Sequence, residues 1–134
     1  MRKILLTLAA AAVLAAPAAA SPRLHGEAEL AKLLEGRTAG KPVDCIDLGR
    51  VYSTQIVDGT AIVYDSGRTL YVNRPRAGAD SMDQWDIMVN RLYSSQLCSI
   101  DTVQLIDQGS RMYSGTVFLG QFVPYRRVQT GSAR

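Results

Sequence analysis

The sequence has very few of the side chains that acid–base and nucleophilic catalysis normally require. His25 is the only histidine, and no glutamate follows Gly36, because the three glutamates are Glu27, Glu29 and Glu35. A Ser-His-Asp or Cys-His arrangement would therefore need His25 to reach residues much later in the chain. From this composition we expect that the protein is not an enzyme and has no catalytic residue.

Sequence motifs for metal or cofactor binding are also absent. The chain contains no Gly-rich phosphate loop, no zinc signature and no dinucleotide-binding fingerprint. Asp80, Asp83 and Asp86 are spaced by three residues, but they lack the alternating ligand positions, the glycine and the closing glutamate of an EF-hand. The sequence therefore predicts no metal site and no cofactor.

The N-terminal residues have the pattern of a secretory signal peptide. Arg2 and Lys3 precede an apolar run from Ile4 to Ala16, and the small residues Ala18–Ala20 suit a signal peptidase. The run is shorter than a membrane span, which needs about 20 residues, and no later segment is long and apolar enough for one. We expect export to the periplasm or the extracellular space, with no transmembrane segment in the mature chain.

The positive and negative charges of the mature chain are also nearly balanced. Removing residues 1–20 leaves 13 of the 15 basic side chains against 12 acidic ones, a net charge of +1. Arg126, Arg127 and Arg134 remain near the C-terminus among small polar residues. Three charges neutralise few phosphates, so we expect residues 126–134 to be a disordered basic tail and nucleic acid not to be a partner.

The two cysteines, Cys45 and Cys98, are predicted to form a disulfide bond, because exported proteins fold in an oxidising compartment. The alternatives fit less well, since redox-active pairs usually have C-x-x-C spacing and metal thiolate sites need further Cys or His ligands. Closing a loop of roughly 50 residues stabilises a fold by about 4 kcal/mol in the chain-entropy model, less any strain in the folded state.

The mature chain is long enough for one domain that begins with a helix and continues in strands. Residues 21–41 are predicted to form a flexible lead and a short helix, Glu27–Glu35, whose leucines share one face and which Gly36 ends. Residues 42–125 form the predicted β domain.

The first half of this β domain is predicted to be an antiparallel meander. Three segments are rich in β-forming residues and are separated by two tight-turn pairs: Val51–Val57, Asp58-Gly59, Thr60–Tyr64, Ser66-Gly67 and Thr69–Val72. The middle segment is apolar on both faces, so we expect it to lie in the interior of the sheet.

The second half is less regular. Ser81–Tyr93 fits both a helix face and strand alternation, and we favour a strand from Asp86 to Leu92. Thr102–Ile106 alternates more clearly, and Val117–Val123 is the predicted last strand, which Pro124 ends or places at a sheet edge. The expected fold class is all-β: a small antiparallel meander or partly closed barrel of about five or six strands with one short N-terminal helix.

Five short motifs between Cys45 and Pro124 share their order and spacing with a known family. They are Cys45-Ile46-Asp47-Leu48, Val57-Asp58-Gly59-Thr60, Leu70-Tyr71-Val72-Asn73-Arg74, Leu97-Cys98-Ser99-Ile100-Asp101 and Leu119-Gly120-Gln121-Phe122-Val123-Pro124. In these motifs the chain resembles the DUF6491-like family of small exported bacterial proteins of uncharacterised function. The resemblance implies an exported β domain and no activity. Family members often carry further cysteines that this chain lacks, so the family's own cysteine pairing can differ.

Two sets of residues are candidates for a functional site. Tyr71, Arg74, Arg76 and Trp85 combine stacking surface with guanidinium donors, which suits an acidic or sugar-like ligand. The second set consists of aspartates that the disulfide would draw together and that would suit a small hydrolase: Asp44, Asp47, Asp101 and Asp107. Aspartates at such positions more commonly cap turns. We therefore favour a non-catalytic module that binds an envelope protein or a small ligand, with the hydrolase as the alternative.

Overall fold

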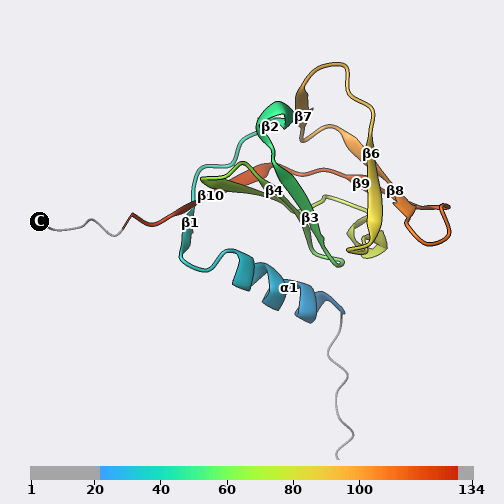
Figure 1. Cartoon of the computed structure of the whole chain (residues 1–134), viewed down its shortest axis with the longest axis horizontal. Helices are drawn as coiled ribbons and strands as arrows, with labels where there is room; N and C mark the ends of the chain where they lie inside the picture. The colour runs from blue at the N-terminus through green and yellow to red at the C-terminus, as the bar shows by residue number, and fades with distance from the viewer. Residues whose placement is uncertain (1–21, 130–134) are drawn as a thin grey trace, which may run out of the picture.

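The computed structural model describes residues 22–129, which form one α-helix, two single-turn 3-10 helices and ten β-strands (Figure 1). The strands lie in antiparallel sheets of five, two and three strands. The predicted all-β class with one helix near the N-terminus is confirmed. The strands outnumber those predicted, and within the described residues no sheet closes into a barrel.

The predicted signal peptide lies outside this range. No helix among residues 22–129 has the length and apolar character to cross a membrane.

The helix α1 (Pro22–Leu33) begins earlier than predicted, so the expected flexible lead is helical from its second residue onward. Proline is favoured in the first turn, because its fixed φ suits a helix and its missing N–H would have no partner there. Gly26 allows a close approach to the sheet, since a side chain at this position would collide with Thr60. Leu30, one turn later, is buried against the same sheet.

The five-stranded sheet has the order β1-β10-β5-β4-β3. Its strands are β1 (Arg37–Ala39), β10 (Phe122–Arg127), β5 (Thr69–Asn73), β4 (Ala61–Asp65) and β3 (Ser53–Val57). The predicted meander β3-β4-β5 is confirmed, including the interior position of β4, which is buried on both faces from Ala61 to Tyr64. Gly59 and Gly67 adopt φ angles of 59° and 80° in the two predicted turns.

The prediction of a single last strand over Val117–Val123 is wrong. This segment contains the end of β9 (Tyr113–Phe118), a short loop and the start of β10. The loop is held by the buried amide of Asn73, which is hydrogen-bonded to both the N–H and the carbonyl of Gly120. The apolar run does not reveal this break, because the break depends on a residue from a distant strand.

Pro124 lies inside β10, between β1 and β5, rather than at its end or on an edge strand. On the β1 side, the neighbour of Pro124 is Gly40, which donates its N–H to the Pro124 carbonyl at 2.7 Å. Gly40 lies just past the end of β1 at Ala39, so no residue of β1 needs an N–H from Pro124. Proline is therefore tolerated in this interior strand.

The prediction that residues 126–134 form a disordered tail is wrong for the first two of them. Arg126 and Arg127 continue β10 and pair with Thr38 and Arg37 of β1. The partner strand β1 has three residues, which are too few to produce a periodic pattern in the sequence. Residues 130–134 of the predicted tail lie outside the described range.

The remaining strands form the two smaller sheets. The pair consists of β2 (Cys45–Asp47) and β7 (Gln96–Cys98), and the three-stranded sheet has the order β6-β8-β9, with β6 (Asp86–Asn90) and β8 (Thr102–Asp107). The preference for a strand over a helix near Asp86 is confirmed. The loop between β8 and β9 covers residues 108–112, because β8 ends at Asp107 and β9 begins at Tyr113.

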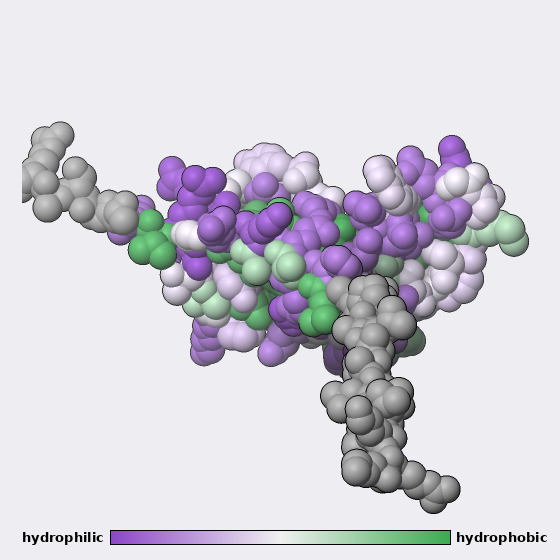
Figure 2. Space-filling model, turned by 90° about the horizontal axis from the view of Figure 1, so that it is seen from below, coloured by the Kyte–Doolittle hydropathy of each residue, from purple (hydrophilic) through white to green (hydrophobic). Residues whose placement is uncertain are grey.

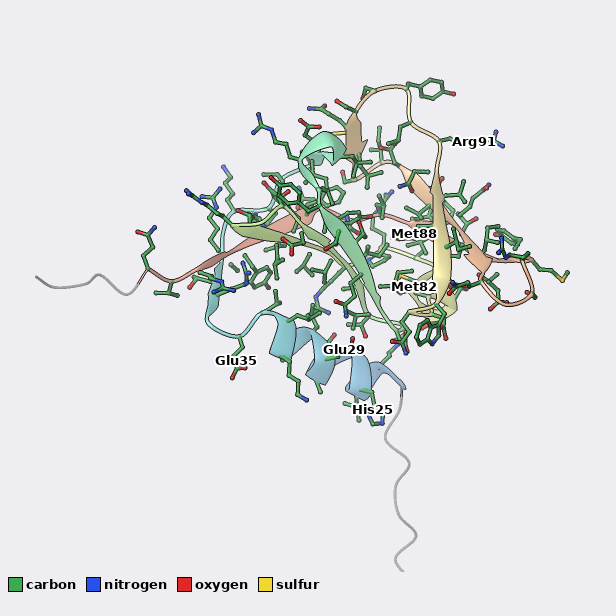
Figure 3. All side chains as sticks on the ribbon, in the orientation of Figure 1. His25, Glu29, Glu35, Met82, Met88 and Arg91 are labelled. Carbon is green, nitrogen blue, oxygen red and sulfur yellow. A yellow bond between two sulfur atoms is a disulfide. The ribbon has the colours of Figure 1, made fainter. Side chains whose placement is uncertain are left out.

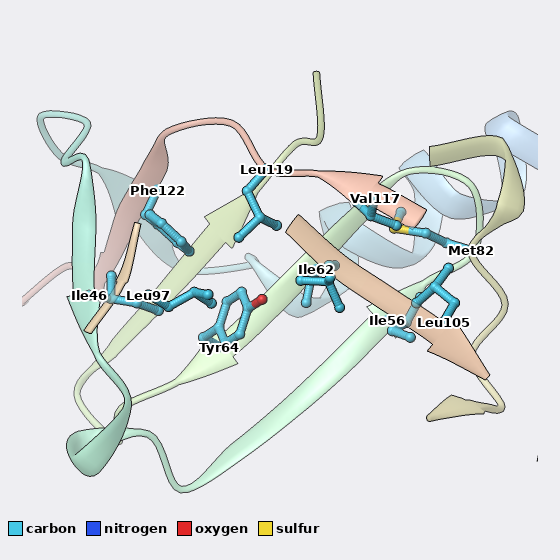
Figure 4. Close-up of a cluster of buried hydrophobic side chains, with 11 residues drawn as sticks. Ile46, Ile56, Ile62, Tyr64, Met82, Leu97, Leu105, Val117, Leu119 and Phe122 are labelled. Carbon is cyan, nitrogen blue, oxygen red and sulfur yellow. The ribbon is translucent and has the colours of Figure 1, made fainter. Parts of the chain in front are cut away.

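Apolar side chains cover both faces of the five-stranded sheet. On one face, Leu30 of α1 packs on Val57, Ala61, Val63, Leu70 and Val72. On the other face, Ile56, Ile62, Tyr64 and Phe122 meet side chains from the two smaller sheets (Figure 4). The rings of Tyr64 and Phe122 are edge-to-face, with centroids 5.7 Å apart. The large sheet therefore lies between α1 on one face and the two smaller sheets on the other. In Figure 1, α1 is below the large sheet, the β2–β7 pair is above it and the three-stranded sheet is to its right. The side that carries α1 is mostly hydrophilic at its surface (Figure 2).

Candidate functional site

The disulfide bond between Cys45 and Cys98 joins the two short strands β2 and β7, as predicted. The two cysteines are directly opposite each other in the antiparallel pair, with Cα atoms 4.0 Å apart. The next residues stay paired, because Ser99 donates its N–H to the Asp44 carbonyl at 2.7 Å. The cross-link therefore fixes the segment after β7, which forms one wall of the candidate site.

Asn73 positions the opposite wall. Its side chain is fully buried, and its amide donates to the Gly120 carbonyl at 2.6 Å and accepts from the Gly120 N–H at 3.0 Å. Gly120 is in close contact with the Arg74 carbonyl, where a Cβ atom would not fit. These contacts hold the loop between β9 and β10 against the end of β5.

Arg76 links these two segments. Its Nε donates to the Leu119 carbonyl at 2.7 Å, and its Nη2 donates to the Ser99 carbonyl at 3.3 Å. A guanidinium group has five N–H donors, so these two bonds orient the side chain and leave other donors available. Arg76 is thus held in place before any ligand arrives.

Arg74 is oriented by Glu27 of α1. Its two terminal nitrogens donate to the two carboxylate oxygens at 2.6 and 3.0 Å, in the bidentate geometry that guanidinium and carboxylate groups favour. These hydrogen bonds hold the pKa of the Glu27 carboxyl below its ordinary value and raise the pKa of Arg74. Both side chains are about half exposed, so the ion pair lies at the surface.

Together these segments line an open pocket of about 390 Å³, which we call the arginine pocket. Its lining residues are Arg74, Arg76, Ser99, Ile100, Gly120 and Gln121. The lining contains two guanidinium groups and no carboxylate, and Ile100, at 81% exposure, adds an accessible apolar side chain. This combination suits a small ligand that carries an anionic group next to an apolar part.

The other two residues of the predicted binding surface lie elsewhere. Tyr71 is half-buried against the larger core and lines a separate pocket of about 530 Å³ next to β2. Trp85 is 66% exposed in the turn before β6 and lines neither pocket. The structure therefore brings Arg74 and Arg76 together and places Tyr71 and Trp85 apart from them.

Four residues of the arginine pocket were not predicted as site residues, namely Ser99, Ile100, Gly120 and Gln121. Each of them belongs to one of the motifs that carry the family resemblance. The motifs could therefore have identified these four residues as candidate site residues. What the sequence did not show is that the motifs around residues 73, 98 and 120 meet at one place.

The predicted aspartates are engaged in local structure. Asp47 accepts from the Gly49 N–H at 2.9 Å, and Asp101 accepts from the Cys98 N–H at 2.7 Å. Asp44 accepts from the Gln121 side chain at 3.0 Å, and Asp107 accepts from the Ser110 N–H at 2.6 Å. Hydrogen bonds from Ser110 also lower the pKa of the Asp107 carboxyl. The contacts of Asp47, Asp101 and Asp107 are turn and capping contacts of the kind that short acidic side chains commonly make, whereas the contact of Asp44 joins two segments far apart in the sequence.

The remaining catalytic and metal-ligand candidates are also dispersed. His25 is exposed on the outer side of α1, away from the sheets (Figure 3). Asp80 forms an ion pair with Arg23, whereas Asp83 and Asp86 accept hydrogen bonds within their own turn. Among residues 22–129, no group of three His, Cys, Asp or Glu side chains lies close enough together to hold a metal ion.

Comparisons with models of protein families, with curated proteins and with solved structures find no match for the chain. The similarity to the DUF6491-like family therefore remains a prediction from the motifs.

Proposed function

We propose that this protein is an exported, non-catalytic binding module that holds the anionic group of a small ligand in the arginine pocket. The observation that carries the proposal is a concave site with two oriented guanidinium groups and no carboxylate in its lining. Arginine is suited to such a role, because its planar fork matches carboxylate and phosphate oxygens.

The pocket is supported by rigid contacts on each side. The disulfide holds the segment of Ser99, the buried Asn73 holds the loop of Gly120, and Arg76 bridges the two. A site that is ordered before binding loses less entropy when the ligand arrives, which raises affinity.

Export is proposed from the N-terminal sequence pattern together with the disulfide. Disulfide bonds form and persist in the periplasm and outside the cell, and they are rare in the reducing cytosol. Cys45 and Cys98 are bonded to each other, which agrees with an oxidising compartment. Localisation of the full-length chain with a C-terminal tag tests this part of the proposal.

The binding proposal is tested with isotope-labelled mature protein titrated with sodium benzoate and with sodium phosphate. Benzoate carries an anionic group beside an apolar ring, whereas phosphate carries the anionic group alone. We expect benzoate to shift the backbone amide signals of Ser99, Ile100, Gly120 and Gln121 more strongly than phosphate does, because Ile100 adds apolar contact.

Three variants make the test specific. Arg74→Gln should weaken benzoate binding about tenfold, the scale of a lost charged hydrogen bond. Glu27→Gln should strengthen it, since the carboxylate that competes for Arg74 is removed. Arg50→Gln, at an exposed arginine outside the pocket, should have no effect. Equal effects of Arg74→Gln and Arg50→Gln would reject the arginine pocket as the site.

A further inference from the structure

A second and larger pocket lies on the face of the large sheet that carries β2, opposite α1 (Figure 1). Its volume is about 530 Å³, within the roughly 300–1,000 Å³ that small-molecule sites occupy. Its walls come from β2, from the residues just before β3, and from the turn between β4 and β5 with the start of β5. Its two aromatic lining residues are Tyr52 and Tyr71, so we call it the tyrosine pocket.

Tyr52 provides an aromatic wall whose position is fixed. Its backbone N–H donates to the Asp65 carbonyl at 2.8 Å, and its side chain lies against the turn between β4 and β5. A Cβ atom at Gly67 in this turn would be only 3.3 Å from a carbon of the ring. The turn therefore supports the ring on one side. Because Tyr52 is 81% exposed, most of the ring remains accessible to a ligand.

Tyr71 of β5 supplies the second aromatic side chain. It is half-buried, since it packs on the larger core and also lines the pocket. Packing on the core restricts its rotation, so less side-chain entropy is lost when a ligand binds. Each tyrosine combines an apolar ring with a hydroxyl group that can donate and accept hydrogen bonds.

The two charged side chains of the tyrosine pocket neutralise each other. Oδ2 of Asp47 lies 3.7 Å from Nε of Arg50, three residues later. Oδ1 of Asp47 accepts from the Gly49 N–H at 2.9 Å, which orients the carboxylate. The pocket therefore offers an anionic acceptor and several guanidinium donors without net charge. In this it differs from the arginine pocket, whose lining has two guanidinium groups and no carboxylate.

These features suit a neutral ligand that is rich in hydroxyl groups and has an apolar ring face, which is the chemistry of a sugar. Sugar hydroxyl groups both donate and accept hydrogen bonds, and the pocket provides polar partners of both kinds. These partners are Asp47, Arg50, Ser66 and Thr69. The C–H groups of a pyranose ring form an apolar face that packs on an aromatic ring. An anion would be repelled by Asp47, and an organic cation by Arg50.

We propose that the tyrosine pocket binds a neutral sugar, with the apolar face of one pyranose ring on Tyr52 and its hydroxyl groups on Asp47 and Arg50. The site binds the sugar without cleaving it, because glycoside hydrolysis normally uses two carboxyl groups. Asp47 is the only carboxylate that residues 22–129 contribute to the lining. The site is separate from the arginine pocket, since the two share no lining residue.

The test is a titration of isotope-labelled mature protein with maltose, with cellobiose and with sorbitol, followed by the backbone amide signals. The two disaccharides contain pyranose rings, whereas sorbitol carries similar hydroxyl groups on an open chain. At millimolar concentration we expect at least one disaccharide, and not sorbitol, to shift the signals of Tyr52, Ser66, Thr69 and Tyr71. Signals of the arginine pocket should stay in place. The proposal is wrong if neither disaccharide shifts these signals, or if sorbitol shifts them equally.

Substitutions locate the sugar within the molecule. Tyr52→Ala removes the aromatic wall and should weaken sugar binding roughly tenfold. Tyr93→Ala should have no effect, because Tyr93 is equally exposed but lines neither pocket. Arg50→Gln should weaken sugar binding about tenfold and leave benzoate binding unchanged, whereas Arg74→Gln should do the reverse. Equal effects of the two tyrosine variants, or sugar binding that depends on Arg74 rather than on Arg50, would overturn the proposal.

Discussion

At the scale of single residues, Asn73 shows how a buried polar group can organise a site. Its amide is fully buried and is matched to the N–H and carbonyl of Gly120, so that neither backbone group lacks a partner. Buried polar groups are costly when unpaired, and this pair therefore fixes where β9 ends and β10 begins. The arginine pocket depends on this bend.

Asn73→Ala should lower the free energy of unfolding by about 1–3 kcal/mol, because both Gly120 groups lose a partner in a buried setting. Urea unfolding of the two proteins measures the difference. Asn90→Ala provides a matched control, since the side-chain oxygen of Asn90 has no hydrogen-bond partner within the described chain. If both substitutions cost the same, the proposed anchoring role of Asn73 is incorrect.

The ion pair between Glu27 and Arg74 should contribute a small stability that depends on pH. The pKa of the Glu27 carboxyl is lowered in the folded protein, so the contribution is present above its ordinary value of 4.5 and is lost as pH falls through the lowered pKa. Because both side chains are about half exposed, we expect roughly 0.2–1 kcal/mol. A double-mutant cycle with Glu27→Gln and Arg74→Gln should give this coupling energy at neutral pH and none in strong acid. A coupling that persists in acid would contradict the assignment.

At the scale of secondary-structure elements, the disulfide compensates for the shortness of β2 and β7. Two strands of three residues form few hydrogen bonds and would be marginal as an isolated pair. The cross-link between cysteines separated by 53 positions keeps them together and restricts the unfolded chain.

Cys45→Ser should therefore lower the free energy of unfolding by about 2–5 kcal/mol and lower the melting temperature. It should also leave Cys98 as a thiol that reacts with a thiol-specific reagent, in contrast to the wild type. The double variant Cys45→Ser, Cys98→Ser separates the loss of the bond from effects of a free thiol. An unchanged melting temperature in both variants would show that the cross-link does not stabilise the fold.

At the scale of the whole molecule, the five-stranded sheet is stable because both of its faces are covered. The smaller sheets cover one face, and α1 covers the other mainly through Leu30, which is 1% exposed. A small domain has few buried side chains, so each layer contributes a substantial share of the stability. We therefore expect the three layers to unfold together in one transition.

Leu30→Ala should lower the free energy of unfolding by about 2–5 kcal/mol, the range for truncating a buried leucine. Leu24→Ala on the same helix is the control, because Leu24 is 63% exposed and should change stability little. Thermal unfolding followed by circular dichroism measures both. A separate early transition in Leu30→Ala would mean that α1 is not part of the cooperative unit.

Much of the fold could be predicted because it depends on local patterns. The meander from β3 to β5 has alternating and apolar segments separated by Asp58-Gly59 and Ser66-Gly67, and these patterns act over a few residues. The disulfide was predictable because the chain has only two cysteines. The strand near Asp86 was favoured by the same kind of alternation, although a helix fitted nearly as well.

The features that could not be predicted depend on contacts between distant segments. The division of Val117–Val123 into two strands is set by Asn73, and the strand character of Arg126 and Arg127 depends on pairing with β1. Very short strands such as β1, β2 and β7 have no periodicity of their own, because their partners alone make them strands.

The sequence by itself determined the all-β class, the meander, the cysteine pair and the scarcity of catalytic side chains, because composition and short-range patterns carry that information. Only the tertiary structure decided that Arg74 and Arg76 face Ser99 and Gly120 across one pocket, and that, among residues 22–129, β6 has a partner strand on one side only. The physical reason is that a pocket or a free edge is a relation between segments far apart in the chain. Such a relation follows from packing and hydrogen-bond pairing, which no single stretch of residues specifies.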